Sequence, residues 1–394
     1  PACGISIGYE MHTGVFYMKK CFLSMLTIAL CAAMLACPAA LAEGVTAETG
    51  QVKAAIVTEA QSGQRIFEKN AEERLNLGGL VRLPALLYAL EYMDSGKLAA
   101  DENIVVSPEA ASVGGATAFL KAGETIKAGT AMKAAVMITA GDATFALAEA
   151  CAGGQDAAVK AINELMQDAG VYTEVSSIDG KGLMLSAEEL AKLGARLAKS
   201  GTYKQYSALY LDEIQHENGT RTELVNQNKL IKSLDGCFAG STGSSSEAQY
   251  CGVFMVKRKG AVFIAAVIGA ADSKTRFSCA SKTIEASAAA VSIKTPVKKG
   301  DKVVENVSVY GGIAKNVNLV AAEDVTLIVW NGDEPRSVIN AEEAYAAPVR
   351  AGDKAGTLEY IFEISGESVG TDLVFDEDVD TAGLADYVVL CFTK

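Results

Sequence analysis

Two long apolar segments at residues 248–270 constrain the fold more than any other part of this sequence. They read AQYCGVFMVKRKGAVFIAAVIGA, and the charged residues of this stretch lie in the run from Lys257 to Gly260. Two apolar runs joined by a short charged turn with glycine predict an antiparallel pair of buried strands. A second strand pair is predicted at 52–70, VKAAIVTEAQSGQRIFEKN, around a turn at Ser62-Gly63.

Helical patterns occupy much of the chain between and after these strands. The predicted helices cover 79–98, 129–154, 156–171, 186–201 and 273–292. In the first, Pro84 is compatible only with the first turn or a kink, and four leucines at helical spacing should face a core: Leu80, Leu83, Leu87 and Leu90. Ser186 and Glu189 form a capping-box pattern. The whole order predicts an α+β domain with helices packed against an antiparallel sheet.

The sequence pattern changes near 294–300, KTPVKKG, from long helical segments to short β segments separated by turn residues. We place a domain boundary there, between an α+β domain at 43–293 and a β-sandwich domain at 294–394. The second domain carries a weak internal echo: VKKGDKV resembles VRAGDKAG, and LVAAEDV resembles LVFDEDV. Two copies predict two similar halves rather than a solenoid, which needs at least three repeats. The acidic DEDVDTAGLAD lacks the glycine of an EF-hand loop and is interpreted as a solvated turn.

The first 42 residues have the order of a secretory leader. Met18-Lys19-Lys20 precedes an uncharged apolar run, and Ala40-Leu41-Ala42 follows as a small-residue cleavage site. We therefore expect a signal peptide at 18–42 with cleavage after Ala42, and an extracytoplasmic protein of the cell envelope. A membrane anchor and lipidation at Cys37 stay open as alternatives. Residues 1–17 are interpreted as an upstream extension without a structural role.

Charge and composition exclude several classes of function. A net charge of −13, with no block rich in lysine or arginine, argues against a nucleic-acid-binding surface. There are two histidines: His12 lies in the leader, and His216 lies in the polar run QHENGT, where we expect a solvated side chain. No dinucleotide fingerprint, P-loop, H-E-x-x-H or G-x-S-x-G pattern occurs. Neither a cofactor nor a metal is therefore predicted.

The cysteines and one small-residue segment leave alternatives open. Five cysteines follow the leader without a C-x-x-C pair: Cys151, Cys237, Cys251, Cys279 and Cys391. This spacing favours buried thiols, with a bridge between Cys237 and Cys251 as the alternative. The segment at 240–249, GSTGSSSEAQ, is predicted to be a flexible loop. It either presents backbone amides to a ligand or serves as a plain polar connection.

Several stretches taken together carry a family resemblance. They are AAIVTEAQSGQRIFEKNAEERL, IVVSPEAASVGGATAFLKAGETI, AGDATFALAEACAGG, the apolar strand pair with SKTRF after it, and the C-terminal VKKGDKV and LVAAEDV. The mature chain resembles the exported D-alanyl-D-alanine carboxypeptidases, which are low-molecular-mass penicillin-binding serine peptidases of peptidoglycan metabolism. The resemblance implies a penicillin-binding, β-lactamase-like α+β domain followed by a smaller β-sandwich.

All three active-site motifs of that family are substituted in this chain. Ser-x-x-Lys falls on Gly79-Leu80-Val81-Arg82, Ser-x-Asn on Thr139-Ala140-Gly141, and Lys-Thr-Gly on Ser241-Thr242-Gly243. Glycine supplies no nucleophilic atom, and an arginine cannot accept the proton that the family's lysine accepts. By the resemblance, Gly141 also removes an amide that holds substrate and lysine, and Ser241 removes a cation that meets the substrate's terminal carboxylate. Thr139, Thr242 and Gly243 remain.

Three functional hypotheses follow from this pattern. The first is a catalytically impaired or inactive homologue that binds cell-wall peptides, with peptidoglycan stem peptides or β-lactams as ligands. The second is an active carboxypeptidase that uses a non-standard site around Thr139, Ser241 or Thr242. The third is a structural or adhesive envelope protein whose cleft is filled, for example by Arg82. The tail GLADYVVLCFTK has Lys394 as its one basic residue, so at most weak membrane contact is expected.

Overall fold

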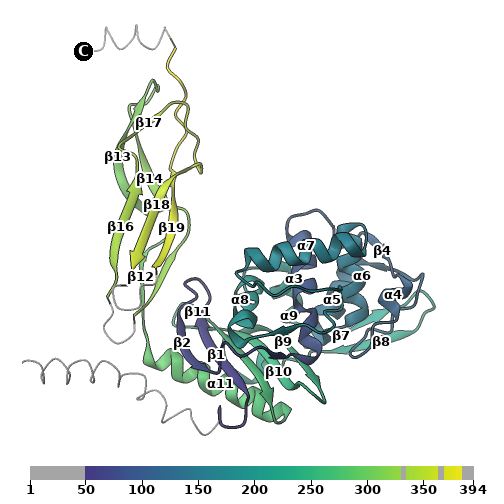
Figure 1. The fold of residues 1–394 in the computed structure, drawn as a ribbon. Coiled ribbons are helices and arrows are strands. Elements are labelled where there is room, and N and C mark those ends of the chain that lie inside the picture. Colours follow the sequence, from purple (N-terminus) through teal and green to yellow (C-terminus); the bar gives the residue numbers. More distant parts are fainter. Residues whose placement is uncertain (1–48, 330–333, 363–367, 384–394) are drawn as a thin grey trace, which may run out of the picture. The chain divides into compact units, whose positions relative to one another are not determined.

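The computed structural model describes residues 49–329, 334–362 and 368–383 (Figure 1). The predicted leader, its cleavage site, Cys37, Cys391 and most of the C-terminal tail lie outside these ranges. None of the helices within them combines the length and apolar character needed to cross a membrane. The described chain has an α+β part followed by a part built from β-strands.

A five-stranded antiparallel sheet in the order β2-β1-β11-β10-β9 forms the centre of the α+β part (Figure 1). Its strands are β1 (Ala54–Glu59), β2 (Arg65–Lys69), β9 (Cys237–Ser245), β10 (Gln249–Arg258) and β11 (Ala261–Ala270). Both predicted strand pairs are confirmed. The turn between β10 and β11 has positive φ at Lys259 (50°) and Gly260 (92°), which is the backbone that a tight two-residue hairpin requires.

Side chains that alternate along each strand fill two different cores. In β1, Ala54 and Ile56 belong to the larger cluster, whereas Ala55 and Val57 belong to the smaller one. Helix α11 (Ser273–Ala290) covers the face of the smaller cluster and buries Phe277 there. Because both faces are covered, the strands read as continuous apolar runs rather than as alternating patterns.

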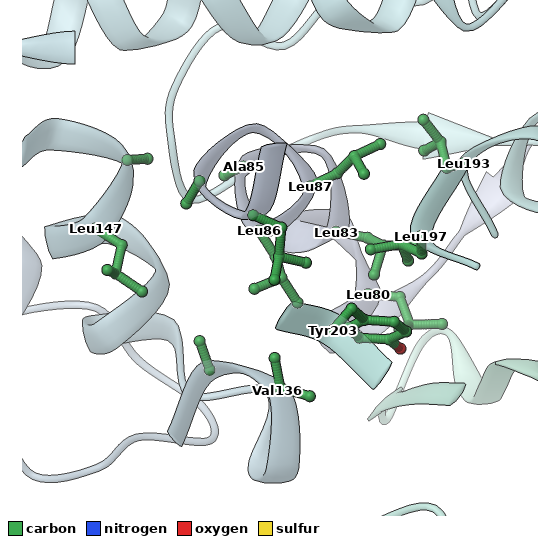
Figure 2. Close-up of a cluster of buried hydrophobic side chains, with 14 of the residues drawn as sticks. Leu80, Leu83, Ala85, Leu86, Leu87, Val136, Leu147, Leu193, Leu197 and Tyr203 are labelled. Carbon is green, nitrogen blue, oxygen red and sulfur yellow. The ribbon is translucent and has the colours of Figure 1, made fainter. Parts of the chain in front are cut away.

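The other face of the sheet packs against the helical region. Its helices are α3 (Leu83–Asp94), α5 (Ala128–Ile138), α6 (Gly141–Ala152), α7 (Gln155–Asp168), α8 (Ala187–Leu197) and α9 (Gly201–Ser207). Figure 2 shows the leucines of α3 among side chains from α8 and α9, and the four predicted core leucines are buried. Pro84 lies in the first turn of α3, and Ser186 and Glu189 make both hydrogen bonds of the predicted capping box.

Short elements complete the α+β part. They are η1 (Gly78–Arg82), β3 (Leu75–Asn76), β4 (Asn103–Val105), α4 (Pro108–Ala111), β5 (Thr125–Lys127), β6 (Met184–Leu185), β7 (Leu211–Gln215), β8 (Arg221–Val225) and α10 (Leu230–Ser233). Three of the two-stranded pairs are β3 with β6, β4 with β5, and β7 with β8. The first predicted helix therefore begins as the 3₁₀ turn η1 and becomes α-helical at Leu83.

The structure corrects the single helix predicted at 129–154. That stretch forms two helices, because α5 ends at Ile138 and α6 begins at Gly141. At the break, Thr139 has a left-handed backbone with φ of 54° and Ala140 is extended. The alanine-rich composition on both sides hides the break, since it favours helix throughout. The break places the residues that match the second family motif at the end of one helix and the start of the next.

The loop predicted at 240–249 is also wrong. Residues 240–245 continue strand β9, which pairs with β10 from Cys237 to Ser245 and forms an edge of the sheet. Small residues are needed here because other segments of the same chain pass close to the strand. A Cβ atom on Gly240 would come within 2.9 Å of the Phe254 ring, and one on Gly243 within 2.5 Å of the backbone nitrogen of Leu80.

The C-terminal part is a β domain in which the two predicted halves are visible. Its strands are β12 (Ser292–Val297), β13 (Lys302–Tyr310), β14 (Asn316–Ala321), β15 (Val325–Val329), β16 (Arg336–Ala341), β17 (Ala344–Ala346), β18 (Lys354–Ile361) and β19 (Ser368–Phe375). They form a six-stranded and a two-stranded sheet. Gly300 N donates to Ala321 O at 2.8 Å, and Gly352 N donates to Phe375 O at 3.0 Å. The repeated sequence segments thus make equivalent backbone hydrogen bonds.

His216 is not the solvated side chain predicted from its polar neighbours. It is 8% exposed, with Nδ1 2.8 Å from Glu124 Oε1 and Nε2 2.8 Å from Thr222 Oγ1. The partner at Glu124 is 92 residues away in sequence, so local composition gives no sign of it. The prediction of buried thiols is confirmed for the described cysteines, all of which are buried: Cys151, Cys237, Cys251 and Cys279.

Candidate functional site

A cleft of about 1000 Å³ lies in the α+β part and collects the residues that match the family motifs. Its lining comes from η1, the loop at 114–119, the break between α5 and α6, strands β8 and β9, and the first turn of α11. Five motif positions line it: Gly79, Arg82, Thr139, Thr242 and Gly243. Gly141 and Ser241 lie outside the lining.

The position of the family's nucleophile is open space. A Cβ atom built on Gly79 would meet only the Cα of Gly243, at 3.6 Å, which is an ordinary van der Waals contact. A Cβ atom would therefore fit here without displacing a neighbour. The backbone around Gly79, which matches the first residue of the Ser-x-x-Lys motif, thus leaves room for a small side chain.

Arg82 occupies the space that a side chain at position 141 would need. A Cβ atom on Gly141 would lie 2.7 Å from Arg82 Cζ and 2.6 Å from Val113 Cγ1. Arg82 Nη2 also donates a hydrogen bond to the carbonyl of Gly114 at 2.5 Å. Two substitutions that look independent in the sequence are thus coupled in space, because the long guanidinium replaces both the lysine and the volume of the amide.

The start of α6 holds the loop that forms this wall of the cleft. The carboxylate of Asp142 accepts hydrogen bonds from the backbone nitrogens of Ala118 and Leu120, each at 3.0 Å or less. Gly141 N donates to Ala116 O at 2.8 Å. With the bond from Arg82 to Gly114, the loop is fixed at several points.

Of the residues that match the third motif, Thr242 and Gly243 line the cleft, whereas Ser241 is buried in the core. Thr139 Oγ1 donates to the Thr242 carbonyl at 3.0 Å and so ties the helix break to β9. Ser241 is 3% exposed, and its Oγ is 2.8 Å from the hydroxyl of Tyr203, which is fully buried. Burial raises the pKa of Tyr203 to about 12. The Ser241 hydroxyl is therefore bound to a neutral phenol of the core.

Arg276 is a cleft residue that the sequence analysis missed. It lies on α11, is 6% exposed, and donates to the carbonyls of Cys251 at 3.1 Å and Gly243 at 3.4 Å. Burial lowers its pKa to about 10, so it stays charged at neutral pH. The signal was present in SKTRF, which helped to carry the resemblance, but only the fold brings this helix to the edge strand.

The ionisable side chains of the cleft are few. Among the described residues that line it they are Arg82, Glu223, Glu247, Tyr250 and Arg276. The lining within the described ranges contains no lysine, histidine, aspartate or cysteine. Within the same ranges no group of three or more histidine, cysteine or carboxylate side chains is placed to hold a metal ion. The two cations of the cleft are both arginines, which do not act as bases.

Comparison with protein-family models assigns both parts of the chain. The D-alanyl-D-alanine carboxypeptidase model matches residues 42–272. The chain belongs to this family. The model of the penicillin-binding protein 5 C-terminal domain matches residues 292–381. The family assignment and the predicted order of an α+β domain and a β domain are both confirmed.

Relatives of known name belong to the same family. The chain is 26% identical over 346 residues to the D-alanyl-D-alanine carboxypeptidase DacF of Bacillus subtilis, covering 86% of this chain and 88% of the relative. It is 25% identical over 379 residues to DacC of Escherichia coli, covering 90% and 92%. The relatives match along nearly their whole length, so this chain has kept the full family arrangement.

Solved structures show the same fold. Penicillin-binding protein 5 from Haemophilus influenzae aligns with a TM-score of 0.64 at 19% identity, covering 84% of this chain and 98% of that one. PBP3 from Streptococcus pneumoniae, described as a peptidoglycan synthesis regulatory factor, aligns with a TM-score of 0.66 at 20% identity, covering 84% and 99%. The fold is therefore retained at a level of identity where individual site residues are free to differ.

Proposed function

We propose that this protein is an exported, catalytically inactive carboxypeptidase homologue that binds the stem peptides of peptidoglycan without cleaving them. The observation that carries the proposal is the lack of any side-chain atom at Gly79, in a position where a side chain would fit. Acyl transfer through a covalent intermediate needs an oxygen or sulfur nucleophile held against a base. Glycine provides no such atom, so no acyl-enzyme forms at this position.

The hydroxyl groups of the cleft do not compensate for this loss. The Thr139 hydroxyl donates its hydrogen bond to the Thr242 carbonyl. The Ser241 hydroxyl forms a hydrogen bond with the Tyr203 hydroxyl in the core. A nucleophilic hydroxyl also needs a neighbour that accepts its proton. The described lining offers neither lysine nor histidine for that role. These contacts argue against the alternative of an active enzyme with a non-standard site.

The cleft nevertheless keeps features suited to binding. Its volume of about 1000 Å³ shows that Arg82 fills one corner rather than the whole space, which argues against a purely structural protein with a blocked cleft. Edge strand β9 runs along the cleft through Thr242, Gly243 and Ser244. An edge strand can pair with an extended peptide through backbone hydrogen bonds.

Export is part of the proposal and is supported by the sequence alone. The order of a basic end, an apolar run and a small-residue site at 18–42 is that of a secretory signal. Peptidoglycan lies outside the cytoplasmic membrane, so a protein that binds its stem peptides must cross that membrane. Expression of the full chain with an antibody against the β domain, followed by fractionation, tests this part; retention in the cytoplasm contradicts it.

Release of D-alanine from a peptide that ends in D-Ala-D-Ala tests the lack of catalysis. We expect release about 10⁶-fold slower than that by a working relative, because removal of the nucleophile alone has this scale of effect in a serine protease. The relative DacF, purified in the same way, is the positive control. Release at a comparable rate, abolished by Thr139→Ala or Ser241→Ala, would establish the active alternative instead.

A further inference from the structure

Arg82 brings a cation into the cleft, and its own hydrogen bonds leave most of its donors unused. Nη2 donates to the Gly114 carbonyl at 2.5 Å, and no other described residue accepts a hydrogen bond from this guanidinium. Nε is buried without a partner. A guanidinium has five N–H donors. Arg82 lines the cleft, and its two terminal nitrogens keep donors that no described residue uses.

Arg276, the other cation of the cleft, is committed to the fold. Its Nη1 donates to two backbone carbonyls and its Nη2 donates to Ser273 Oγ at 3.3 Å, while its Nε, like that of Arg82, is buried without a partner. The residue is 6% exposed, whereas Arg82 is half-buried in the lining of the cleft. A ligand carboxylate consequently finds more free donors on Arg82 than on Arg276.

Arg82 lies on the same side of η1 as the empty position at Gly79. In a 3₁₀ turn, side chains three positions apart are eclipsed, and η1 spans Gly78–Arg82. Both residues line the cleft, and the space at Gly79 is bounded by the Gly243 Cα. The open space at Gly79 therefore shares the cleft with a guanidinium rather than with a lysine, and that guanidinium lies more than 4 Å from the Cβ position at 79.

No carboxylate of the described residues forms an ion pair with Arg82. Asp142 and Asp179 are near enough to raise its pKa, but burial lowers that pKa by more. Both carboxylates already accept other hydrogen bonds, Asp142 from the backbone of the 118–120 segment and Asp179 from Ser177 Oγ. A partly desolvated cation without a direct counterion favours an anionic ligand.

The chemistry of the family's reaction defines which peptide has an anion at this place. A nucleophile at position 79 would attack the carbonyl carbon of the penultimate D-alanine. Before cleavage that carbon belongs to a neutral amide, and after cleavage it belongs to the terminal carboxylate of the shortened peptide. The shortened peptide thus presents a charge beside Arg82, whereas the uncut peptide presents a neutral amide there and leaves the guanidinium unpaired.

We infer that this cleft recognises the trimmed stem peptide, the product of its relatives' reaction, through a terminal carboxylate bound by Arg82, and binds it more tightly than the uncut peptide. This inference rests on the proposed function and names its ligand. The substitutions at 79, 82 and 141 then act together: the first removes chemistry and makes room, the second supplies the receptor, and the third accommodates the larger side chain.

Isothermal titration calorimetry of the purified full chain tests the inference with three probes. They are diacetyl-L-lysyl-D-alanine, the C-terminal amide of the same compound, and diacetyl-L-lysyl-D-alanyl-D-alanine. We expect the free acid to bind about 10-fold more tightly than either other probe, the effect of one charge-assisted hydrogen bond pair. Equal affinity for acid and amide, or tighter binding of the longer peptide, overturns the inference. This comparison uses the wild-type chain alone.

Arg82→Met assigns the effect to the guanidinium. We expect the variant to lose the preference for the acid and to keep the wild-type affinity for the amide. Arg350→Met, in the β domain, removes an arginine that pairs with Asp380 and should leave the preference intact. A preference that survives Arg82→Met overturns the inference but leaves the proposed function standing. If the wild type binds none of the probes, both are overturned, and hydrolysis of the longer peptide overturns the proposed function.

Discussion

The sheet core and the floor of the cleft belong to the same domain. The sheet core keeps its buried apolar side chains, whereas the floor of the cleft differs from the family at the motif positions. In β10 and β11 the apolar side chains fill both faces of the sheet, and every position from Cys251 to Val256 is buried. In the cleft lining, a glycine stands at the position that matches the family's serine, Gly79, and an arginine at the position that matches its lysine, Arg82; Gly141 lies behind Arg82, outside the lining. The core thus retains what folding requires, whereas on the proposed function the floor of the cleft lacks what covalent catalysis requires.

On the proposed function, the scaffold and the chemistry are separable in this family. Relatives at 25–26% identity match over most of their length, yet the nucleophile position carries no side-chain atom. The space at Gly79 stays open, whereas the space at Gly141 is taken by Arg82. The floor of the cleft is therefore rearranged around Arg82 and not filled in.

The largest effect is expected in the helical core. Leu87 lies on α3, is fully buried, and packs in the cluster shown in Figure 2. Leu87→Ala removes buried methyl groups and leaves a cavity, which should lower the free energy of unfolding by about 2–5 kcal/mol. Urea unfolding followed by circular dichroism measures the change. A loss below about 1 kcal/mol would show that the core is far less tightly packed than the structure indicates.

Gly79 and Gly243, which are direct neighbours in the lining of the cleft, form a matched pair. A Cβ on Gly243 would lie 2.5 Å from Leu80 N, but a Cβ on Gly79 would lie 3.6 Å from its nearest neighbour. Gly243→Ala should therefore cost about 1–3 kcal/mol, and Gly79→Ala should stay within about 0.5 kcal/mol of wild type. The same unfolding experiment compares them. Equal costs would contradict the open space assigned to the nucleophile position.

The contact between Arg82 and position 141 predicts a coupling free energy. Gly141→Ala forces the Arg82 guanidinium to move, because the new Cβ would lie 2.7 Å from Cζ. In an Arg82→Ala background that clash is gone and only Val113 must adjust. A double-mutant cycle should give a coupling of about 1 kcal/mol. Additive effects of the two substitutions would show that they are independent.

Glu189 provides a smaller effect with a defined pH dependence. Burial raises the pKa of its carboxyl, but hydrogen bonds from Arg74, Ser186 N and Thr173 outweigh burial and lower it overall. A lowered folded-state pKa stabilises the fold above the unfolded pKa near 4.5, and this stability is lost as pH falls through the folded-state value. Glu189→Gln should cost about 1 kcal/mol at pH 7 and less at pH 3. A cost that does not depend on pH would contradict this.

Local patterns predicted the kept part of the molecule well, because the strands at 52–70 and 248–270 and the capping box at Ser186 depend on nearby residues. Features fixed by distant partners were missed. The left-handed Thr139 interrupts an alanine-rich stretch, and the buried His216 depends on Glu124. Strand β9 was predicted to be a loop because it is rich in glycine and serine, which are not typical of strands. These small residues are present because other segments of the chain pack closely against the strand.

The seven motif positions were found through the family resemblance, which fixed their places in the sequence but not in space. Their sequence numbers did not reveal that Arg82 fills the place of a side chain at Gly141, nor that Ser241 is bonded to Tyr203 away from the cleft. Arg276 was not singled out, since its role depends on α11 crossing β9 and β10. Contacts between segments far apart in the chain decide these points.

The most direct test of the central claim is the intact mass of the protein after incubation with benzylpenicillin. It is measured on the wild type beside a Gly79→Ser/Arg82→Lys/Ser241→Lys variant. The account predicts that the wild-type mass is unchanged, because the cleft has no nucleophile to open the β-lactam ring. An adduct in the variant alone would show a cleft that kept its shape and lost its chemistry. A stable covalent adduct on the wild type would contradict the account.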